Sequence, residues 1–278
     1  MTGSPLADAV GIYPTWSLEA RGIDRRHRMR LIEEGRLVPV TRGWFATRDA
    51  DQTALMAMRS GARLTCISAA RIHGLWSPLV PGMHVYARRG RVPPRFIAHG
   101  PYCDAWPETE PVASLGLCLQ HAARCLTPEQ SAILFESSMT HKLLTPGEVG
   151  DLARPLPLRI RSRLGVLSGL SQSGSETRVA RWLRGRGIAF TQQARIPGVG
   201  KVDFLVGRSW VIETDSKAHH TAVPNYETDR RRDLAARLLG YSVTRLSFTQ
   251  VWDDWAATQR DLGALIATRH HLRVPRAA

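Results

Sequence analysis

Hydrophobic and polar positions alternate in a regular order over the last third of the chain. Helical spacing over residues 175–186 is followed by three short runs with strand-like alternation. A further helix, a strand and a final helix follow over residues 225–239, 241–248 and 249–268. The predicted order is therefore αβββαβα, with its first three strands over residues 189–196, 201–206 and 209–215.

The beginning of the chain predicts two short helices and a β-hairpin. The helices cover residues 15–20 and 25–34, and each is followed by a glycine that can end it. Apolar stretches on either side of residues 41–43 predict the hairpin.

The middle of the chain is less regular. It predicts two helices within residues 50–76, β-like pieces within the proline-rich residues 80–110, and helices across residues 111–153. A stretch rich in Pro, Ser and Gly then places the main boundary near residue 170. We expect an α+β protein in three parts, over residues 1–80, 81–168 and 169–278.

Composition narrows the class of partner. The chain has 278 residues and a formal net charge of +14, which comes almost entirely from arginine. Guanidinium groups bind phosphate bidentately, so we expect double-stranded DNA as the partner, with RNA as the alternative. The chain begins without a leader-like segment and contains no apolar run of membrane-spanning length, so we expect a cytoplasmic protein with no membrane partner. Composition leaves the oligomeric state open.

The cysteines give no sequence signature of a metal site. None of the four forms a CxxC pair, which argues against a zinc ribbon or finger. Cys118 and Cys125 lie seven positions apart on one face of a predicted helix, where small core residues are the simplest interpretation.

The second predicted helix carries a dense group of basic side chains. A basic helix followed by a basic hairpin is the arrangement of a winged helix-turn-helix, in which the helix enters the major groove and the wing follows the backbone. The alternative is a solvated helix whose arginines only face water. We expect the DNA-contacting side chains to be Arg25, Arg26, Arg28 and Arg30 of the helix and Arg42 of the wing.

Acidic side chains end two of the predicted strands in the last part of the chain. Asp203 ends one strand, and Glu213 and Asp215 share a face of the next because side chains alternate along a strand. Converging carboxylates need a cation to neutralise them, and oxygen ligands suit Mg²⁺ or Mn²⁺. We therefore predict a metal site at Asp203, Glu213 and Asp215. Glu176 is either a further acid of this site or the partner of Ser173 in a capping box.

The placement of these acids on the predicted αβββαβ order of elements resembles that of the PD-(D/E)XK nuclease superfamily. The stretches ETDSKAHH and YETDRRRDLAARLLGYSVTRLSF more closely resemble a bacterial nuclease-like family related to very-short-patch repair endonucleases. Residues 11–75 are similar to the winged-helix region of AbiEi-type antitoxin proteins. The resemblance implies a restriction-endonuclease-like αβββαβ domain after an N-terminal winged helix, with Glu176, Asp203 and Glu213 in the active site.

The chain departs from the superfamily pattern at one position that matters for catalysis. Asp215 stands where the motif has its lysine, two residues after Glu213. The resemblance implies that Lys217 or Lys201 takes the place of that lysine, and that His219 or His220 acts as a base or orients water. Arg230 and Arg231 either contact phosphate or form salt bridges.

Two classes of function follow from these patterns. The first is a DNA endonuclease that depends on Mg²⁺ or Mn²⁺ and is directed to its target by the winged helix. The second is a DNA-binding regulator or antitoxin-like protein whose nuclease fold is catalytically silent. The three acids favour the enzyme, and Asp215 at the lysine position favours the regulator.

Overall fold

A computed structural model describes residues 10–87, 92–100, 110–215 and 226–275. The fold combines helices and sheets, which confirms the expected α+β class. The chain divides into two compact units, one formed by residues 1–134 and 148–164 and the other by residues 135–147 and 165–278. No helix among the described residues is long and apolar enough to cross a membrane.

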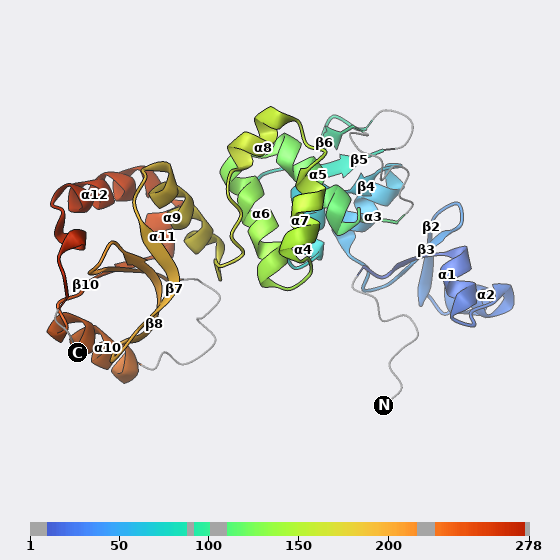
Figure 1. Cartoon of the computed structure of the whole chain (residues 1–278). Helices are drawn as coiled ribbons and strands as arrows, with labels where there is room; N and C mark the ends of the chain where they lie inside the picture. Colours follow the sequence, from blue (N-terminus) through green and yellow to red (C-terminus); the bar gives the residue numbers. More distant parts are fainter. Residues whose placement is uncertain (1–9, 88–91, 101–109, 216–225, 276–278) are drawn as a thin grey trace. The chain divides into compact units, whose positions relative to one another are not determined.

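The first unit begins with a small three-stranded sheet and two helices (Figure 1). Asp24 begins the second helix by accepting a hydrogen bond from the His27 backbone N–H at 2.7 Å, and Gly43 makes the hairpin turn with a positive φ of 78°. The elements are β1 (Ile12–Pro14), α1 (Thr15–Ala20), α2 (Arg25–Glu33), β2 (Leu37–Thr41) and β3 (Trp44–Thr47), in the sheet order β1-β3-β2.

The rest of the first unit packs helices against a second three-stranded sheet. Strand β4 pairs antiparallel with β5, and β5 pairs parallel with β6. The elements are α3 (Gln52–Arg59), β4 (Arg63–Leu64), α4 (Cys66–Ile72), β5 (Met83–Tyr86), β6 (Phe96–His99), α5 (Leu115–Cys125), the first part of α6 (Pro128–Thr140), α7 (Pro146–Ala153) and α8 (Leu158–Leu164).

The second unit follows the predicted order of elements. Its sheet has the order β10-β9-β8-β7, in which β9 and β10 are parallel and the other neighbours are antiparallel. The predicted last helix is two helices, because Ser247 and Gln250 form a capping box and the first of them ends at Trp252. The elements are α9 (Gly174–Gly185), β7 (Phe190–Ile196), β8 (Gly200–Val206), β9 (Trp210–Thr214), α10 (Tyr226–Leu238), β10 (Ser242–Leu246), α11 (Phe248–Trp252), α12 (Trp255–Ala267) and the 3₁₀ turn η2 (His270–Leu272).

Helices cover both faces of this sheet (Figure 1). Helices α9, α11 and α12 pack on one face around Phe204 and Ile212. Helix α10 packs on the other face, where Ala236 contacts a smaller cluster that includes Val211. Two buried layers hold the sheet rigid, so side chains at its strand ends have fixed positions.

The main body of the C-terminal unit begins at residue 165, close to the predicted boundary near residue 170, but the unit also includes an earlier segment. Residues 135–147 belong with the C-terminal unit, because the buried carboxylate of Glu136 is tied to it. Glu136 accepts hydrogen bonds from the backbone N–H of Ser168 at 3.0 Å, from the hydroxyl of Ser171 at 2.8 Å and from that of Thr177 at 2.9 Å. These donors satisfy side-chain oxygens that would be costly to bury without hydrogen-bond partners.

Candidate functional site

Three acidic side chains from three elements lie near one another in the second unit. Helix α9 supplies Glu176, β8 supplies Asp203 and β9 supplies Glu213. Burial raises the pKa of all three carboxyl groups, and the charge of Asp203 raises the pKa of both Glu176 and Glu213 further. The structure therefore brings two of the three predicted metal ligands, Asp203 and Glu213, together with Glu176.

Glu176 has the most strongly raised pKa of the three acids. Its side chain is buried, and it accepts hydrogen bonds from the Gln172 backbone N–H at 2.8 Å and from Gln193 Nε2 at 2.7 Å. Ser173 caps α9 by accepting from the Glu176 backbone N–H at 3.2 Å, so cap and acid are adjacent. Burial, and then the nearby charge of Asp203, raise the pKa of Glu176 to about 7. A carboxyl group with this pKa exchanges its proton near neutral pH.

Asp203 is held by the neighbouring strand. Its Oδ2 accepts from the Thr214 backbone N–H at 2.8 Å and from the Thr214 hydroxyl at 3.3 Å. These bonds, and the positive charges of Lys201 and Arg232, lower the pKa of Asp203 and partly offset the effect of burial. Of the two lysines that the resemblance implied, Lys201 is thus close enough to act on the carboxylate electrostatically.

Glu213 is engaged by two arginines. Arg232 of α10 lies 3.1 Å from Oε1, and Arg245 lies 3.0 Å from Oε2 at the register position opposite Glu213 on β10. Both charges lower the pKa of Glu213 against the effect of burial. Arg245 also contacts Asp233 at 2.8 Å, which makes a network of two acids and two arginines along this edge.

The remaining candidates of this region separate into two groups. Asp215 follows the last residue of β9 and is exposed, and its backbone N–H donates to the Leu246 carbonyl at 2.8 Å. Arg230 and Arg231 lie on α10 with exposed side chains. Lys217, His219 and His220 lie outside the described residues.

Gln193 is a site residue that the sequence analysis missed. It lies on β7 between two residues paired with β8, Gln192 with Phe204 and Ala194 with Val202, and its side chain holds Glu176. Its φ of 53° is in the left-handed region, which a residue with a Cβ rarely adopts. Strained backbone of this kind clusters at functional sites. Only its glutamine side chain within a strand marked it in the sequence.

The arginines of the N-terminal unit differ in exposure. Arg25, Arg26 and Arg30 of α2 and Arg42 beside the hairpin turn are exposed, as DNA-contacting side chains must be. Arg28, which was also predicted to contact DNA, differs from them in exposure. Its side chain is 11% exposed, lies 3.7 Å from Glu19 and stacks over the Phe45 ring at 5.2 Å. Arg28 therefore links α2 to α1 through Glu19 and to the hairpin strand β3 through Phe45.

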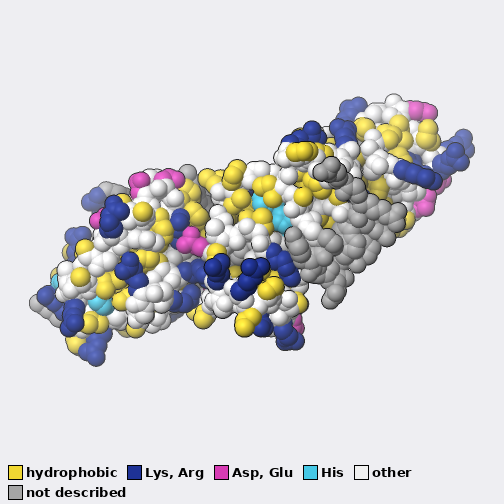
Figure 2. Space-filling view, turned by 90° about the horizontal axis from the view of Figure 1, so that it is seen from above, with side chains coloured by type: hydrophobic (Ala, Val, Ile, Leu, Met, Phe, Trp, Pro, Cys, Tyr) yellow, Lys and Arg dark blue, Asp and Glu magenta, His cyan; other side chains and the backbone are white. Residues whose placement is uncertain are grey.

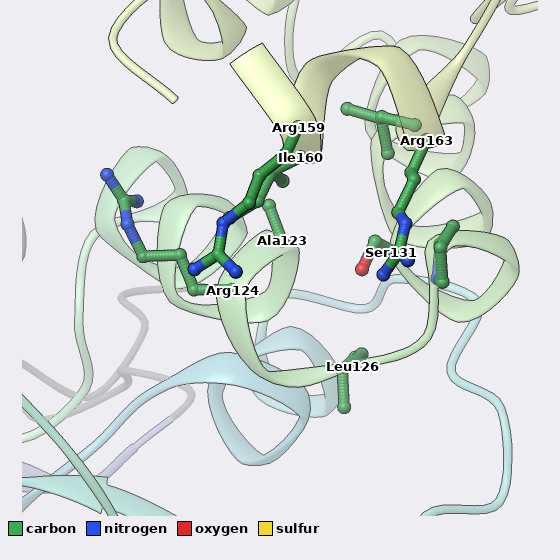
Figure 3. A pocket seen from close by; sticks show the side chains of 9 residues that line it. Ala123, Arg124, Leu126, Ser131, Arg159, Ile160 and Arg163 are labelled. Atoms are coloured by element: carbon green, nitrogen blue, oxygen red, sulfur yellow. The ribbon is translucent and has the colours of Figure 1, made fainter. Parts of the chain in front are cut away.

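Basic side chains are also prominent elsewhere on the surface. The face in Figure 2 carries many Lys and Arg side chains and few acids. A pocket between α5, α6 and α8 is lined by Arg124, Arg159 and Arg163, with Ser131 at its wall (Figure 3). The arginines at this pocket extend the positive surface of the first unit.

A group of potential metal ligands lies in the first unit, whereas the predicted acids belong to the second. Cys66, His84, His99 and Cys125 each direct one ligand atom to a common point, with all four atoms within 4.8 Å of one another. It is the only such group of His, Cys, Asp and Glu found among the described residues. The prediction that Cys125 is a core residue is wrong, because its side chain is exposed at the end of α5.

Comparison with models of known protein families and with curated proteins finds no match to this chain. The function is therefore argued from the geometry of the two units.

Proposed function

We propose that this protein is a DNA endonuclease whose active site is the Glu176, Asp203 and Glu213 cluster. The observation that carries the proposal is the convergence of these three acids in a half-buried space where the pKa of each is raised. Clustered acids whose pKa is raised by burial and by one another's charge are typical of catalytic sites. The order αβββαβ and the sheet order β10-β9-β8-β7 support the resemblance to the PD-(D/E)XK superfamily.

The donor set fits Mg²⁺ or Mn²⁺. Asp203 and Glu213 would hold the ion, since both offer carboxylate oxygens at neighbouring strand ends and both have a pKa raised by burial. When bound, such an ion polarises a phosphoryl oxygen and lowers the pKa of an attacking water. Asp215, exposed beyond β9, is available to an ion at the rim of the site.

Other steps of the proposed reaction would depend on residues of the chain itself. Glu176, with a pKa of about 7, can accept or release a proton near neutral pH. Thr214 orients Asp203, and Gln193 orients Glu176. Lys201 supplies positive charge beside Asp203, where a phosphate would need it. The exposed arginines of α2 and the hairpin would hold the DNA duplex in the manner of a winged helix.

A second function is favoured by two observations. Glu213 already has both carboxylate oxygens within 3.1 Å of arginine nitrogens, and Asp215 occupies the lysine position of the motif. A protein without catalytic activity would satisfy its acids in this way. It would then act as a DNA-binding regulator with a silent nuclease fold.

A cleavage assay on supercoiled plasmid, with and without Mg²⁺ or Mn²⁺, decides between the two. The endonuclease nicks or linearises the plasmid only with metal, and Asp203→Asn and Glu213→Gln abolish cleavage. Asp261→Asn, which changes an exposed acid on α12, is the matched control and retains full activity. Metal-independent plasmid binding without cleavage, unchanged in all three variants, would leave the regulator as the function.

A further inference from the structure

We propose that Cys66, His84, His99 and Cys125 form a structural zinc site that fastens together the second sheet and the helices of the first unit. The four residues come from four elements: the first residue of α4, strand β5, the last residue of β6 and the last residue of α5. All four belong to the same compact unit. The proposal is independent of the nuclease site.

The contacts within the cluster match the dimensions of a single tetrahedral ion. His84 Nδ1 lies 3.1 Å from His99 Nε2 and 3.6 Å from Cys125 Sγ. With zinc bonds of about 2.0–2.3 Å, the edges of a tetrahedron are roughly 3.3–3.8 Å. All four ligand atoms lie within 4.8 Å of one another, so small side-chain rotations close the shell. The spacing suits one ion rather than an iron–sulfur cluster.

The backbone directs these side chains to one point. Strands β5 and β6 are parallel with His84 opposite Ile97 and Tyr86 opposite His99, so the two histidines are diagonal neighbours on one face of the sheet. Cys66 has a φ of 50°, in the left-handed region that disfavours a residue with a Cβ. This strained turn begins α4 and places the thiol against the sheet.

The donor chemistry selects the metal. Two thiolates and two imidazoles are soft and intermediate ligands, which favour zinc over magnesium, calcium or manganese. Two thiolates also neutralise a divalent cation, so the loaded site has no net charge and suits its burial, since Cys66, His84 and His99 are all buried. Four protein ligands leave no open position for a substrate, which makes the site structural.

The site explains how short elements hold their positions. Strands β5 and β6 have four residues each, and β4 has two. Sheets of this size have little intrinsic stability. One ion bound to two of the strands and to the ends of two helices would link them directly, in the way that structural zinc supplies folding free energy to small domains.

The test is the metal content of the full-length protein, purified without chelator and measured by inductively coupled plasma mass spectrometry. We expect about one zinc per chain in the wild type. Cys125→Ser should lose nearly all of it and still fold, because this ligand is exposed and contributes little to packing. Cys118→Ala is the matched control, since Cys118 supplies no ligand atom to the cluster, and this variant should keep its zinc.

Thiol reactivity supplies a readout that does not depend on folding of the variants. In the wild type, Cys125 should react slowly with a thiol reagent such as Ellman's reagent until a chelator strips the zinc, and rapidly afterwards. Cobalt(II) added to the stripped protein should give the visible absorption of a tetrahedral thiolate site, which Cys125→Ser lacks. Wild-type protein without metal that takes up neither zinc nor cobalt, or that contains a Cys66–Cys125 disulfide by mass spectrometry, would overturn the proposal.

Discussion

The carboxylate of Glu136 on α6 accepts a hydrogen bond of 2.9 Å from the hydroxyl of Thr177 on α9, 41 positions further along the chain. Glu136 is fully buried, and Ser168 and Ser171 complete its shell of donors. The contact joins a segment in the middle of the sequence to the helix that carries Glu176. The hydrogen bond therefore helps to hold in place the helix that carries a residue of the proposed active site.

Removing this carboxylate should destabilise the C-terminal unit. Glu136→Ala leaves three donors without their acceptor, two of them the buried hydroxyls of Ser171 and Thr177, at a cost of about 2 kcal/mol. Urea denaturation, with hydrogen exchange of peptides from α9 as the local probe, measures the loss. Asp261→Ala, at an exposed position on α12, should change stability little. Equal stability of the two variants would show that the Glu136 shell contributes nothing.

Stability of the metal-free protein should fall as the pH rises from about 4.5 to about 7, because of Glu176. Its pKa is raised from 4.5 to about 7 in the folded protein, so the folded state binds this proton more tightly than the unfolded state. The penalty is fully present above pH 7, where it is at most about 3 kcal/mol. Glu176→Gln should reduce this slope when melting temperatures are compared between pH 5 and 8. Burial also raises the pKa of Asp203 and Glu213, so a smaller slope can remain, but an unchanged slope in the variant would contradict the assignment to Glu176.

Asp203→Asn should stabilise the metal-free protein at pH 8. The substitution removes the negative charge that raises the pKa of Glu176, and the asparagine oxygen can still accept the hydrogen bonds from Thr214. Added Mn²⁺ should raise the melting temperature of the wild type but not that of the variant, because ligand binding stabilises only the folded state that binds it. The opposite order, with Mn²⁺ stabilising only the variant, would exclude Asp203 as a metal ligand.

DNA binding should depend on the exposed arginines of the first unit. Replacing Arg25, Arg26, Arg30 and Arg42 with Ala should weaken duplex binding and flatten its salt dependence, by about 0.9 in logarithmic slope for each phosphate group that the protein no longer neutralises. Fluorescence anisotropy at several salt concentrations measures both effects. A control removes the same charge from exposed arginines of the second unit, at Arg208, Arg237, Arg260 and Arg273. If both variants bind DNA equally weakly, net charge and not the proposed winged helix governs binding.

The sequence predicted features that depend on neighbours along the chain. The cap at Asp24, the turn at Gly43 and the strand alternation of β8 and β9 are local, and so was the placing of Asp203 and Glu213. The Cys and His cluster was missed because its members are spread over 60 positions, from Cys66 to Cys125, and meet only through the parallel register of β5 with β6. A search for closely spaced CxxC pairs cannot find ligands that long-range strand pairing brings together.

Two ion pairs at Glu213 show the same limit. Arg232 and Arg245 are ordinary members of a charged helix and a strand in the sequence. Their contact with Glu213 follows from the crossover from β9 through α10 to β10, which returns a parallel strand beside Glu213. Ion pairs between residues far apart in the sequence decide whether an acid is available to a metal. The pattern of neighbouring residues does not predict these ion pairs.

The position of Glu136 in the chain determines when its hydrogen bonds can form during synthesis. The ribosome completes residues 135–147 well before it reaches Ser171 and Thr177, which satisfy the Glu136 carboxylate in the finished fold. At about 5–20 residues per second, this acid waits roughly 2–8 s for its last partner. During that interval the Glu136 carboxylate lacks its native donors. Residues 135–147 can therefore complete their native contacts in the C-terminal unit only after Thr177 has been synthesised.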